Sequence, residues 1–459
     1  MADDNKKTVE FPLKKKSKLP ILITVIILVL AAIIALILLG RNRQVDMTDD
    51  TLIASLDYEL SSKADFYTYE DNIYYATKDG MQLINERGNS EWSDSYTMIS
   101  PVLIGDKNIV AVAEDNGTTV RLYNENGLLY NVSFNETVLT FAINSAGYLG
   151  TVNKNNSDYS LSIYDESGTV VFGASFPADD GIPTCMDISD DGRMFSVGFI
   201  NTSGINIESN ILFYYINSND VQSVENSDGM FASVVSEDCI PVILRFTSDS
   251  RCIAVTDDRA LFINPTAAED NRTVEVPLGN RLKAVCINGD GTLAMAMGEQ
   301  ILNADNQLAE NTVVWYNSNG SKINEYTPDK EITALFPGID MTVLAMDRNF
   351  EAYNTKGQSV WTYTAIQDTT KVLPFNGSDK MLVVTPMRAM IAKVGRGNSL
   401  IEIETETSNE RIEETTSQAQ AETQVENQSE IQSESQTEIE TETQIETTTE
   451  QNTQSEEAE

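Results

Sequence analysis

The side chains that could do chemistry in this chain are mainly carboxylates, because the sequence holds 70 aspartates and glutamates but no histidine. The lack of histidine removes the commonest general base, the commonest partner of serine and cysteine nucleophiles, and the commonest transition-metal ligand. A catalytic site would therefore need two acidic side chains that converge, with the pKa of one of them raised. Sequence spacing cannot show such convergence, so we predict no catalytic residue, no cofactor and no metal site.

Cysteines and acidic turns are the other possible ligands. Cys185, Cys239, Cys252 and Cys286 are too scattered for paired zinc-ligand motifs, and three of them stand among apolar residues. We interpret them as buried thiols, with a disulfide as the alternative. The acidic turns, such as the one at Asp190, lack the alternating ligand spacing of a calcium loop and fit turns between strands instead.

The overall charge excludes one large class of function. The formal net charge is −39 and the pI is about 4.2. Nucleic acids and anionic membrane surfaces attract basic faces, so this composition opposes binding to either. We therefore predict no nucleic-acid partner.

The segment Leu19–Leu39 is an uninterrupted apolar run, long enough to cross a bilayer as one helix. Lysines crowd the preceding residues 1–18, which the positive-inside rule places in the cytoplasm. We therefore predict a single-pass cell-membrane protein with a linker at 40–50 and an extracytoplasmic body at 51–400. The alternative is a cleaved signal peptide, but no small-residue cleavage site follows Leu39.

Residues 401–459 form a tail rich in Glu, Thr, Gln and Ser, without aromatic residues or glycine. Such a composition buries too little apolar surface to offset the entropy of ordering, so we predict that this acidic tail is disordered.

The body repeats two turn patterns at intervals of roughly 40 residues. The first is a turn rich in Asp, Gly and Asn, followed by an apolar strand, and its copies begin at Glu70, Gly105, Ser145, Asp190, Ser248, Gly289, Gly338 and Gly377. The second is an apolar residue, then usually Asn or Asp, then a turn, and its copies begin at Ile84, Tyr123, Tyr164, Ile216, Ile263, Tyr316 and Tyr353. Two hairpins per unit make four antiparallel strands, which is the blade of a β-propeller.

The count of blades depends on the two ends of the body. The last unit lacks a convincing second turn, whereas Thr51–Tyr58 is a strand-like segment without a blade of its own. If that segment completes the last blade, the ring closes by pairing the chain ends. We therefore predict an all-β, eight-bladed propeller, with seven blades or a long β-sandwich as alternatives.

The repeats, such as SDDGR from Ser189, resemble those of WD40, YVTN and pyrroloquinoline-quinone-like propellers. The whole layout is similar to an uncharacterised family of single-pass, membrane-anchored propeller proteins of Gram-positive bacteria. The chain departs from WD40 proteins because it has no Trp-Asp dipeptide, and from the quinone enzymes because Trp92, Trp315 and Trp361 are its only tryptophans. The resemblance implies a fold and a location but no activity, because propellers host many unrelated functions.

Loop lengths suggest which face of the propeller binds. Loops between second and third strands share a face with the connections between blades, and four long insertions are assigned there: Asn201–Asn210, Asn226–Asp238, Gly298–Asn311 and Pro177–Pro183. Residues 264–272 form a longer loop on the opposite face. Binding residues gather on loops carried by a rigid scaffold. The candidate partner-binding residues are Asn201, Asn210, Asp257, Asp258, Arg259, Gly298, Asn311, Asp347 and Arg348.

Two classes of function remain open at this point. The favoured one is a binding or scaffolding module of the cell envelope, whose partner is a protein or a cell-wall polymer. The alternative is an extracytoplasmic hydrolase or lyase that uses carboxylates at the mouth of the propeller channel.

Overall fold

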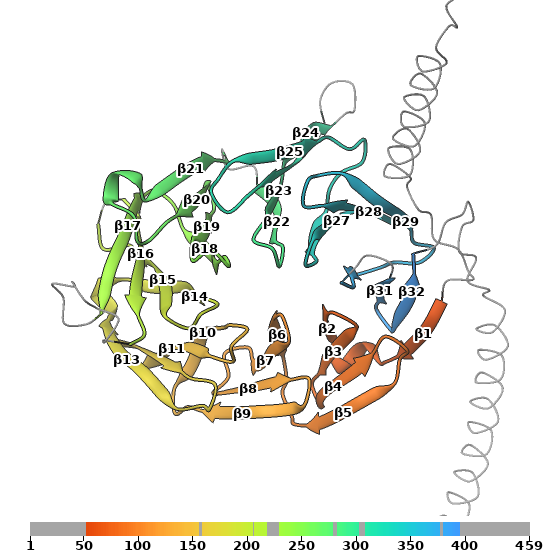
Figure 1. Cartoon of the computed structure of the whole chain (residues 1–459), viewed down its shortest axis with the longest axis horizontal. Coiled ribbons are helices and arrows are strands. Elements are labelled where there is room, and N and C mark those ends of the chain that lie inside the picture. The colour runs from red at the N-terminus through yellow and green to blue at the C-terminus, as the bar shows by residue number, and fades with distance from the viewer. Residues whose placement is uncertain are drawn as a thin grey trace, which may run out of the picture. The chain divides into compact units, whose positions relative to one another are not determined.

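The computed structural model describes residues 52–155, 158–204, 206–217, 229–278, 282–302, 308–376 and 380–394. These residues form an all-β propeller of eight blades, and each blade is one four-stranded antiparallel sheet. Figure 1 shows the blades as a ring, with the first strand of a blade innermost and its last strand at the rim. The predicted fold class is confirmed, with eight blades rather than seven.

The first four blades follow one another along the chain. Blade 1 contains β2 (Asp65–Tyr69), β3 (Asn72–Thr77), β4 (Gly80–Asn85) and β5 (Ser90–Ser95). Blade 2 contains β6 (Pro101–Asp106), β7 (Ile109–Glu114), β8 (Thr119–Asn124) and β9 (Gly127–Ser133). Blade 3 contains β10 (Thr137–Ile143), β11 (Leu149–Asn155), β12 (Asp158–Tyr164) and β13 (Val170–Pro177). Blade 4 contains β14 (Ile182–Ile188), β15 (Met194–Asn201), β16 (Glu208–Tyr215) and β17 (Met230–Glu237).

The remaining blades complete the ring. Blade 5 contains β18 (Pro241–Phe246), β19 (Cys252–Thr256), β20 (Arg259–Ile263) and β21 (Thr273–Pro277). Blade 6 contains β22 (Leu282–Ile287), β23 (Leu293–Leu302), β24 (Leu308–Tyr316) and β25 (Lys322–Tyr326). Blade 7 contains β26 (Ala334–Pro337), β27 (Met341–Met346), β28 (Asn349–Asn354) and β29 (Ser359–Thr364). Blade 8 contains β30 (Lys371–Pro374), β31 (Lys380–Thr385), β32 (Arg388–Lys393) and β1 (Leu52–Asp57). Short 3-10 turns are η2 (Leu60–Ser62), η3 (Ala178–Asp180) and η5 (Glu269–Asn271).

The apolar content of each strand follows its place in the blade. The second strand is covered by neighbouring blades on both faces, and every residue of β27, for example, is buried. The outermost strands instead alternate, as in β13, between exposed and half-buried residues. The core is therefore a series of layers between blades, such as the cluster that joins Phe199 of blade 4 to Leu161 of blade 3.

The recurring turns are built by side-chain and backbone geometry, as predicted. The Asp165 carboxylate accepts hydrogen bonds from the backbone N–H groups of Ser167 and Thr169, at 2.9 Å each. Gly168 adopts a φ of 77°, a left-handed conformation that glycine reaches without steric cost. Asp and Gly in these turns therefore serve the hairpin.

The ring closes through the two ends of the described chain. Strand β1 pairs antiparallel with β32, with Asp57 opposite Arg388 and Leu52 opposite Ala392. This confirms the prediction that Thr51–Tyr58 supplies the missing outer strand of the last blade. The four cysteines are free and buried, which confirms their interpretation as thiols.

The structure corrects two of the predicted loop insertions, the first in its face and the second in its extent. Within Asn226–Asp238, residues 230–237 form β17, and the connection before this strand joins the third and fourth strands of blade 4. Within Gly298–Asn311, the pairs Gly298–Asn311 and Glu299–Glu310 extend the hairpin of β23 and β24. Both errors arose because strand segments that contain several polar residues look like loops in the sequence.

The predicted transmembrane helix at 19–39 and the acidic tail at 401–459 lie outside the described residues. Within the described ranges, no helix has the length and apolar character needed to cross a membrane.

Candidate functional site

The two ends of the propeller carry different connections. The turns between first and second strands, and between third and fourth strands, lie at one end, which we call the turn face. The loops between second and third strands, and the connections between blades, lie at the other end, which we call the loop face. Leu52 pairs with Ala392 near the end of β32, so the described chain enters and leaves the propeller at the turn face.

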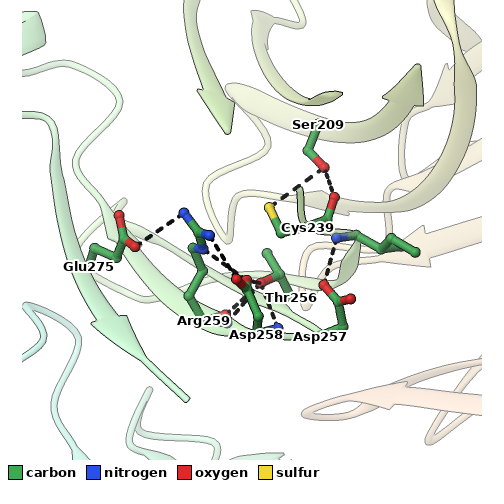
Figure 2. A network of polar contacts seen from close by, with 8 residues as sticks. Ser209, Cys239, Thr256, Asp257, Asp258, Arg259 and Glu275 are labelled. Atoms are coloured by element: carbon green, nitrogen blue, oxygen red, sulfur yellow. Dashed lines mark hydrogen bonds and ion pairs between the residues drawn. The ribbon is translucent and has the colours of Figure 1, made fainter. Parts of the chain in front are cut away.

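The predicted residues Asp257, Asp258 and Arg259 lie on the loop face of blade 5, where the two aspartates connect β19 to β20 and Arg259 begins β20. Figure 2 shows the Arg259 guanidinium between Asp258 and Glu275. Its Nε and Nη2 atoms donate to the two oxygens of Asp258 at 2.8 and 2.7 Å, and its Nη1 lies 3.2 Å from Glu275 Oε1. These hydrogen bonds hold the pKa of Asp258 below its ordinary value. The two charges therefore already satisfy each other.

The neighbouring carboxylate fastens blade 5 to the connection that precedes it. Asp257 Oδ1 accepts a hydrogen bond from the Ile240 backbone N–H at 2.7 Å. The Ser209 hydroxyl of blade 4 donates to the Cys239 carbonyl in the same network (Figure 2). This part of the loop face is thus a fixed joint between two blades.

Arginines on the loop face of blades 7 and 8 are held in the same way. Arg348 donates to Asp368 Oδ1 at 2.7 Å and to the Ile366 carbonyl at 3.0 Å. Arg388 donates to Asp57 Oδ1 at 2.6 Å. Asp347 lies at the tip of its loop with a φ of 59°.

The asparagine candidates make contacts within their own loops and strands. Asn201 accepts hydrogen bonds from Ser203, and Asn210 lies within β16 rather than in a loop. Asn311 is only 4% exposed, and its side chain donates to the carbonyls of Pro328 and Lys330 while accepting from the Ile332 N–H. Asn311 therefore positions the connection between blades 6 and 7.

Sequence reasoning missed an arc of exposed aliphatic side chains on the loop face. These residues lie at the start of innermost strands, or just before one, in neighbouring blades 2 to 5, and we call them the mouth arc: Ile99, Val102, Leu139, Ile182 and Val242. Ile99 is 82% exposed and Val242 is 57% exposed. Leu139 and Val242 occupy β-bulges, where the pairing of β10 and β18 skips one residue. Bulges commonly re-aim side chains near functional sites.

Several carboxylates without ion-pair partners among the described residues share the loop face with the mouth arc. They lie in or beside the connections into blades 3, 4 and 5: Glu136, Asp179, Asp180, Glu237 and Asp238. Unlike Asp258, they leave their negative charge available to a partner.

A groove of about 480 Å³ lies elsewhere on the loop face, between β1 and blade 1. Two of its carboxylates are already neutralised, because Asp57 pairs with Arg388 and Asp94 accepts from Arg121 at 2.6 Å. The groove therefore lies at the polar contact between β1 of blade 8 and blade 1, where the ring closes.

An axial cavity of about 270 Å³ lies at the turn-face end of the innermost strands. Its lining mixes aromatic, aliphatic and charged residues, among them Tyr67, Tyr69, Asp106, Lys107, Ile243, Arg245, Ile287, Ile339 and Pro374. Arg245 of blade 5 reaches blade 2, where its Nη2 lies 2.7 Å from Asp106 Oδ1. Lys107 of blade 2 reaches Asp190 of blade 4 at 2.8 Å.

A second carboxylate faces Arg245 from blade 4. Asp187 Oδ1 lies 3.8 Å from Arg245 Nη1, and its Oδ2 accepts from the Phe246 N–H at 2.5 Å. Burial raises the pKa of Asp187 to about 7, although Arg245 opposes the shift. Asp187 is not among the described residues that line the cavity, so the acid with the raised pKa does not face space for a substrate.

Residues 41–393 match the family described as "Family of unknown function (DUF5711)". The chain belongs to this family. No curated protein matches the sequence significantly.

Three solved structures align with this DUF5711 member at low sequence identity. Sqt1 from Chaetomium thermophilum is 9% identical with a TM-score of 0.46, over 77% of this chain and 99% of that one. The WD40 domain of Neurospora crassa Pan2 is 8% identical with a TM-score of 0.43, over 77% of this chain and 97% of that one. BamB from Moraxella catarrhalis is 14% identical with a TM-score of 0.41, over 75% of this chain and 99% of that one.

The sequence of this DUF5711 member holds a signal for two of the residues that our sequence analysis missed, Arg245 and Asp187. Arg245 and Asp187 are charged residues inside otherwise apolar strands, in PVILRF and IPTCMDI, and such charges are normally paired when buried. The mouth arc had no such signal, because an aliphatic residue at the start of a strand usually packs inside. Within the described residues, no group of three or more Asp, Glu or Cys side chains could hold a metal ion.

Proposed function

We propose that this DUF5711 member is a membrane-anchored, extracytoplasmic propeller that serves as a binding module of the cell envelope, and that its partner is a protein held on the loop face. The observation that carries the proposal is the mouth arc. Single exposed aliphatic residues are common, but neighbouring ones across four blades are typical of interaction sites.

The chemistry of the mouth arc favours a protein partner over a polar wall polymer. Aliphatic side chains gain most when they are buried against other apolar side chains, by about 25 cal/mol per Å² of apolar surface. The carboxylates in the connections between blades, such as Asp179 and Asp238, add long-range attraction for a basic surface and suppress association with acidic ones. The partner therefore combines an apolar protrusion with a basic rim.

The chain path is consistent with this arrangement. Because the segment that precedes Leu52 reaches the propeller at the turn face, an anchor at 19–39 would tether that face and leave the loop face open. The axial carboxylates do not support the hydrolase or lyase alternative, since Asp106 and Asp187 share Arg245.

Cross-linking in intact cells with a membrane-impermeant reagent tests the function and the orientation together. The full chain should capture a partner, and Leu139→Asp combined with Val242→Asp should reduce the cross-linked yield at least about tenfold, because a charge in a buried apolar contact costs more than 1.4 kcal/mol. The matched control is Val170→Asp, which adds a charge at an exposed position in the outer strand of blade 3.

The possible results separate the parts of the proposal. Capture that survives in the mouth-arc double variant but is lost in Val170→Asp would move the binding surface to the rim. Capture only by a membrane-permeant reagent would overturn the extracytoplasmic orientation.

A further inference from the structure

The groove of about 480 Å³ between β1 and blade 1 is not part of the protein contact proposed at the mouth arc. One of its walls is the face of blade 1 that packs toward blade 8. Strand pairing arranges the lining residues of this wall in two neighbouring rows across three strands: Tyr75–Gln82–Ser93 and Thr77–Gly80–Ser95. Alternate residues of a strand share one face of a sheet, so both rows belong to the same wall.

The rows carry no charge and keep polar groups available. The side chains of Gln82, Ser93 and Ser95 have no hydrogen-bond partner among the described residues, and both serines are exposed. Hydroxyl and amide groups can donate and accept hydrogen bonds at the same site. Gly80 adds no side chain between its neighbours, and a Cβ there would lie only 2.5 Å from the Asp94 carbonyl oxygen. This wall therefore offers neutral donors and acceptors beside open space.

The opposite wall is aromatic and held in place. The Tyr58 hydroxyl donates to the Thr385 carbonyl, and the Tyr58 ring centroid lies 6.1 Å from that of Tyr75. The Lys78 N–H donates to the Ser62 carbonyl at 2.9 Å, which ties η2 to the hairpin between β3 and β4. Binding in a groove that is already formed loses less conformational entropy than binding that must first order the walls.

The charges of the groove oppose anions without forming a strong cation site. Its lining has four carboxylates and one lysine. Asp57 and Asp94 are already paired with arginines. That leaves Glu59 and Asp79 beside Lys78, none of which has an ion-pair partner among the described residues. The unpaired groups thus differ by a single negative charge.

We propose that this groove binds a short oligosaccharide without acidic groups. Sugar hydroxyls both donate and accept, which matches the two rows of blade 1, and the apolar C–H face of a sugar ring can pack on Tyr58. The volume lies in the range of small-ligand sites. A basic peptide fits less well, because it needs several unpaired carboxylates and the blade 1 wall is uncharged.

Isothermal calorimetry on the full chain tests the site, in a detergent whose head group contains no sugar and with empty micelles as the blank. The neutral probes are tri-N-acetylchitotriose and maltotriose. We expect saturable binding of at least one of them in the millimolar range or tighter, and at least about tenfold weaker binding of acidic trigalacturonate. Saturable binding of neither neutral sugar, or equal binding of trigalacturonate, would overturn the proposal, and binding of tetralysine alone would make the groove a peptide site.

Two groove variants and one control locate the binding. Gln82→Ala combined with Ser93→Ala removes free hydrogen-bonding groups and should weaken sugar binding at least about fivefold. Ser95→Trp keeps those groups but fills the groove from an exposed position, so it should weaken binding about tenfold or more and tests the site even if the double variant folds poorly. Ser175→Trp makes the same change at an exposed position in the outer strand of blade 3 and should leave binding unchanged.

Unaltered binding in both groove variants would place the sugar elsewhere and refute the site. The result is separate from the proposed function, because sugar binding to the purified chain requires neither the membrane orientation nor partner capture at the mouth arc.

Discussion

The two ends of the innermost strands differ in which side chains they expose and which they pair. At the turn-face end, Arg245 and Lys107 reach across blades to Asp106 and Asp190, so that charges near the axis are paired with one another. At the loop-face end, the mouth arc exposes aliphatic side chains, and nearby carboxylates such as Asp179 have no ion-pair partner among the described residues.

This difference separates what maintains the ring from what is free to bind. A buried charge that loses its partner destabilises the fold, whereas an exposed carboxylate or aliphatic residue contributes little to folding. Substitutions at the turn-face end should therefore change stability first, and substitutions at the loop-face end should change binding first.

The largest effect is expected from Arg245→Met. The change leaves Asp106 and Asp187 buried without their shared cation, and we expect a loss of about 3–5 kcal/mol in unfolding free energy. Chemical denaturation followed by tryptophan fluorescence measures it. Arg251→Met, which removes the exposed pair with Asp249 in the same blade, is the control and should cost at most about 1 kcal/mol. Equal small losses in both variants would show that the axial charges do not hold the ring.

A smaller, pH-dependent effect is expected from Asp187→Asn. The folded-state pKa of about 7 lies above the ordinary value of 3.8, so between these pH values the folded chain keeps a proton that the unfolded chain releases. Stability from this group is thus present at low pH and falls as pH rises toward 7. We expect Asp187→Asn to remove roughly 1–4 kcal/mol of that decline.

The measurement for Asp187 compares thermal unfolding across this pH range. Glu166→Gln is the control, because the whole chain is strongly acidic and self-repulsion also destabilises it as pH rises. If Asp187→Asn and Glu166→Gln showed the same pH slope, the assigned pKa of Asp187 would be wrong.

The fold could be predicted because its signals are local and repeated. Asp and Gly at fixed positions, as in the Asp165–Gly168 turn, are typical of a few tight turns, so each copy of the pattern marks a hairpin. The segment Thr51–Tyr58 had no blade of its own and could pair only with the incomplete last blade. The predicted strand boundaries were wrong where polar residues take part in strand pairing, as in β17 and at Gly298–Asn311. Periodicity does not distinguish such strands from loops.

The candidate sites could be predicted only in part, because both depend on residues far apart in the sequence. Loop position placed Asp257 and Arg348 on the loop face, but it could not show that neighbouring groups already satisfy their charges. The pairing of Arg245 with Asp106 joins blades 5 and 2, a contact that no local pattern encodes. Bulges such as the one at Val242 likewise arise from strand pairing rather than from residue type.

The smallest effect is expected from Arg259→Met, which removes an arginine from the loop-face end instead of the axis. Arg259 lies close to both Asp258 and Glu275. Glu275 is half exposed, however, so water can replace the lost contacts. We expect a loss of at most about 1 kcal/mol, reduced further by salt, because exposed ion pairs are screened. Denaturation at low and high ionic strength measures it, with Arg388→Met, which breaks the equivalent pair with Asp57, as the matched variant. A loss as large as that of Arg245→Met would mean that the loop-face network also maintains the ring, and the contrast between the two ends would no longer hold.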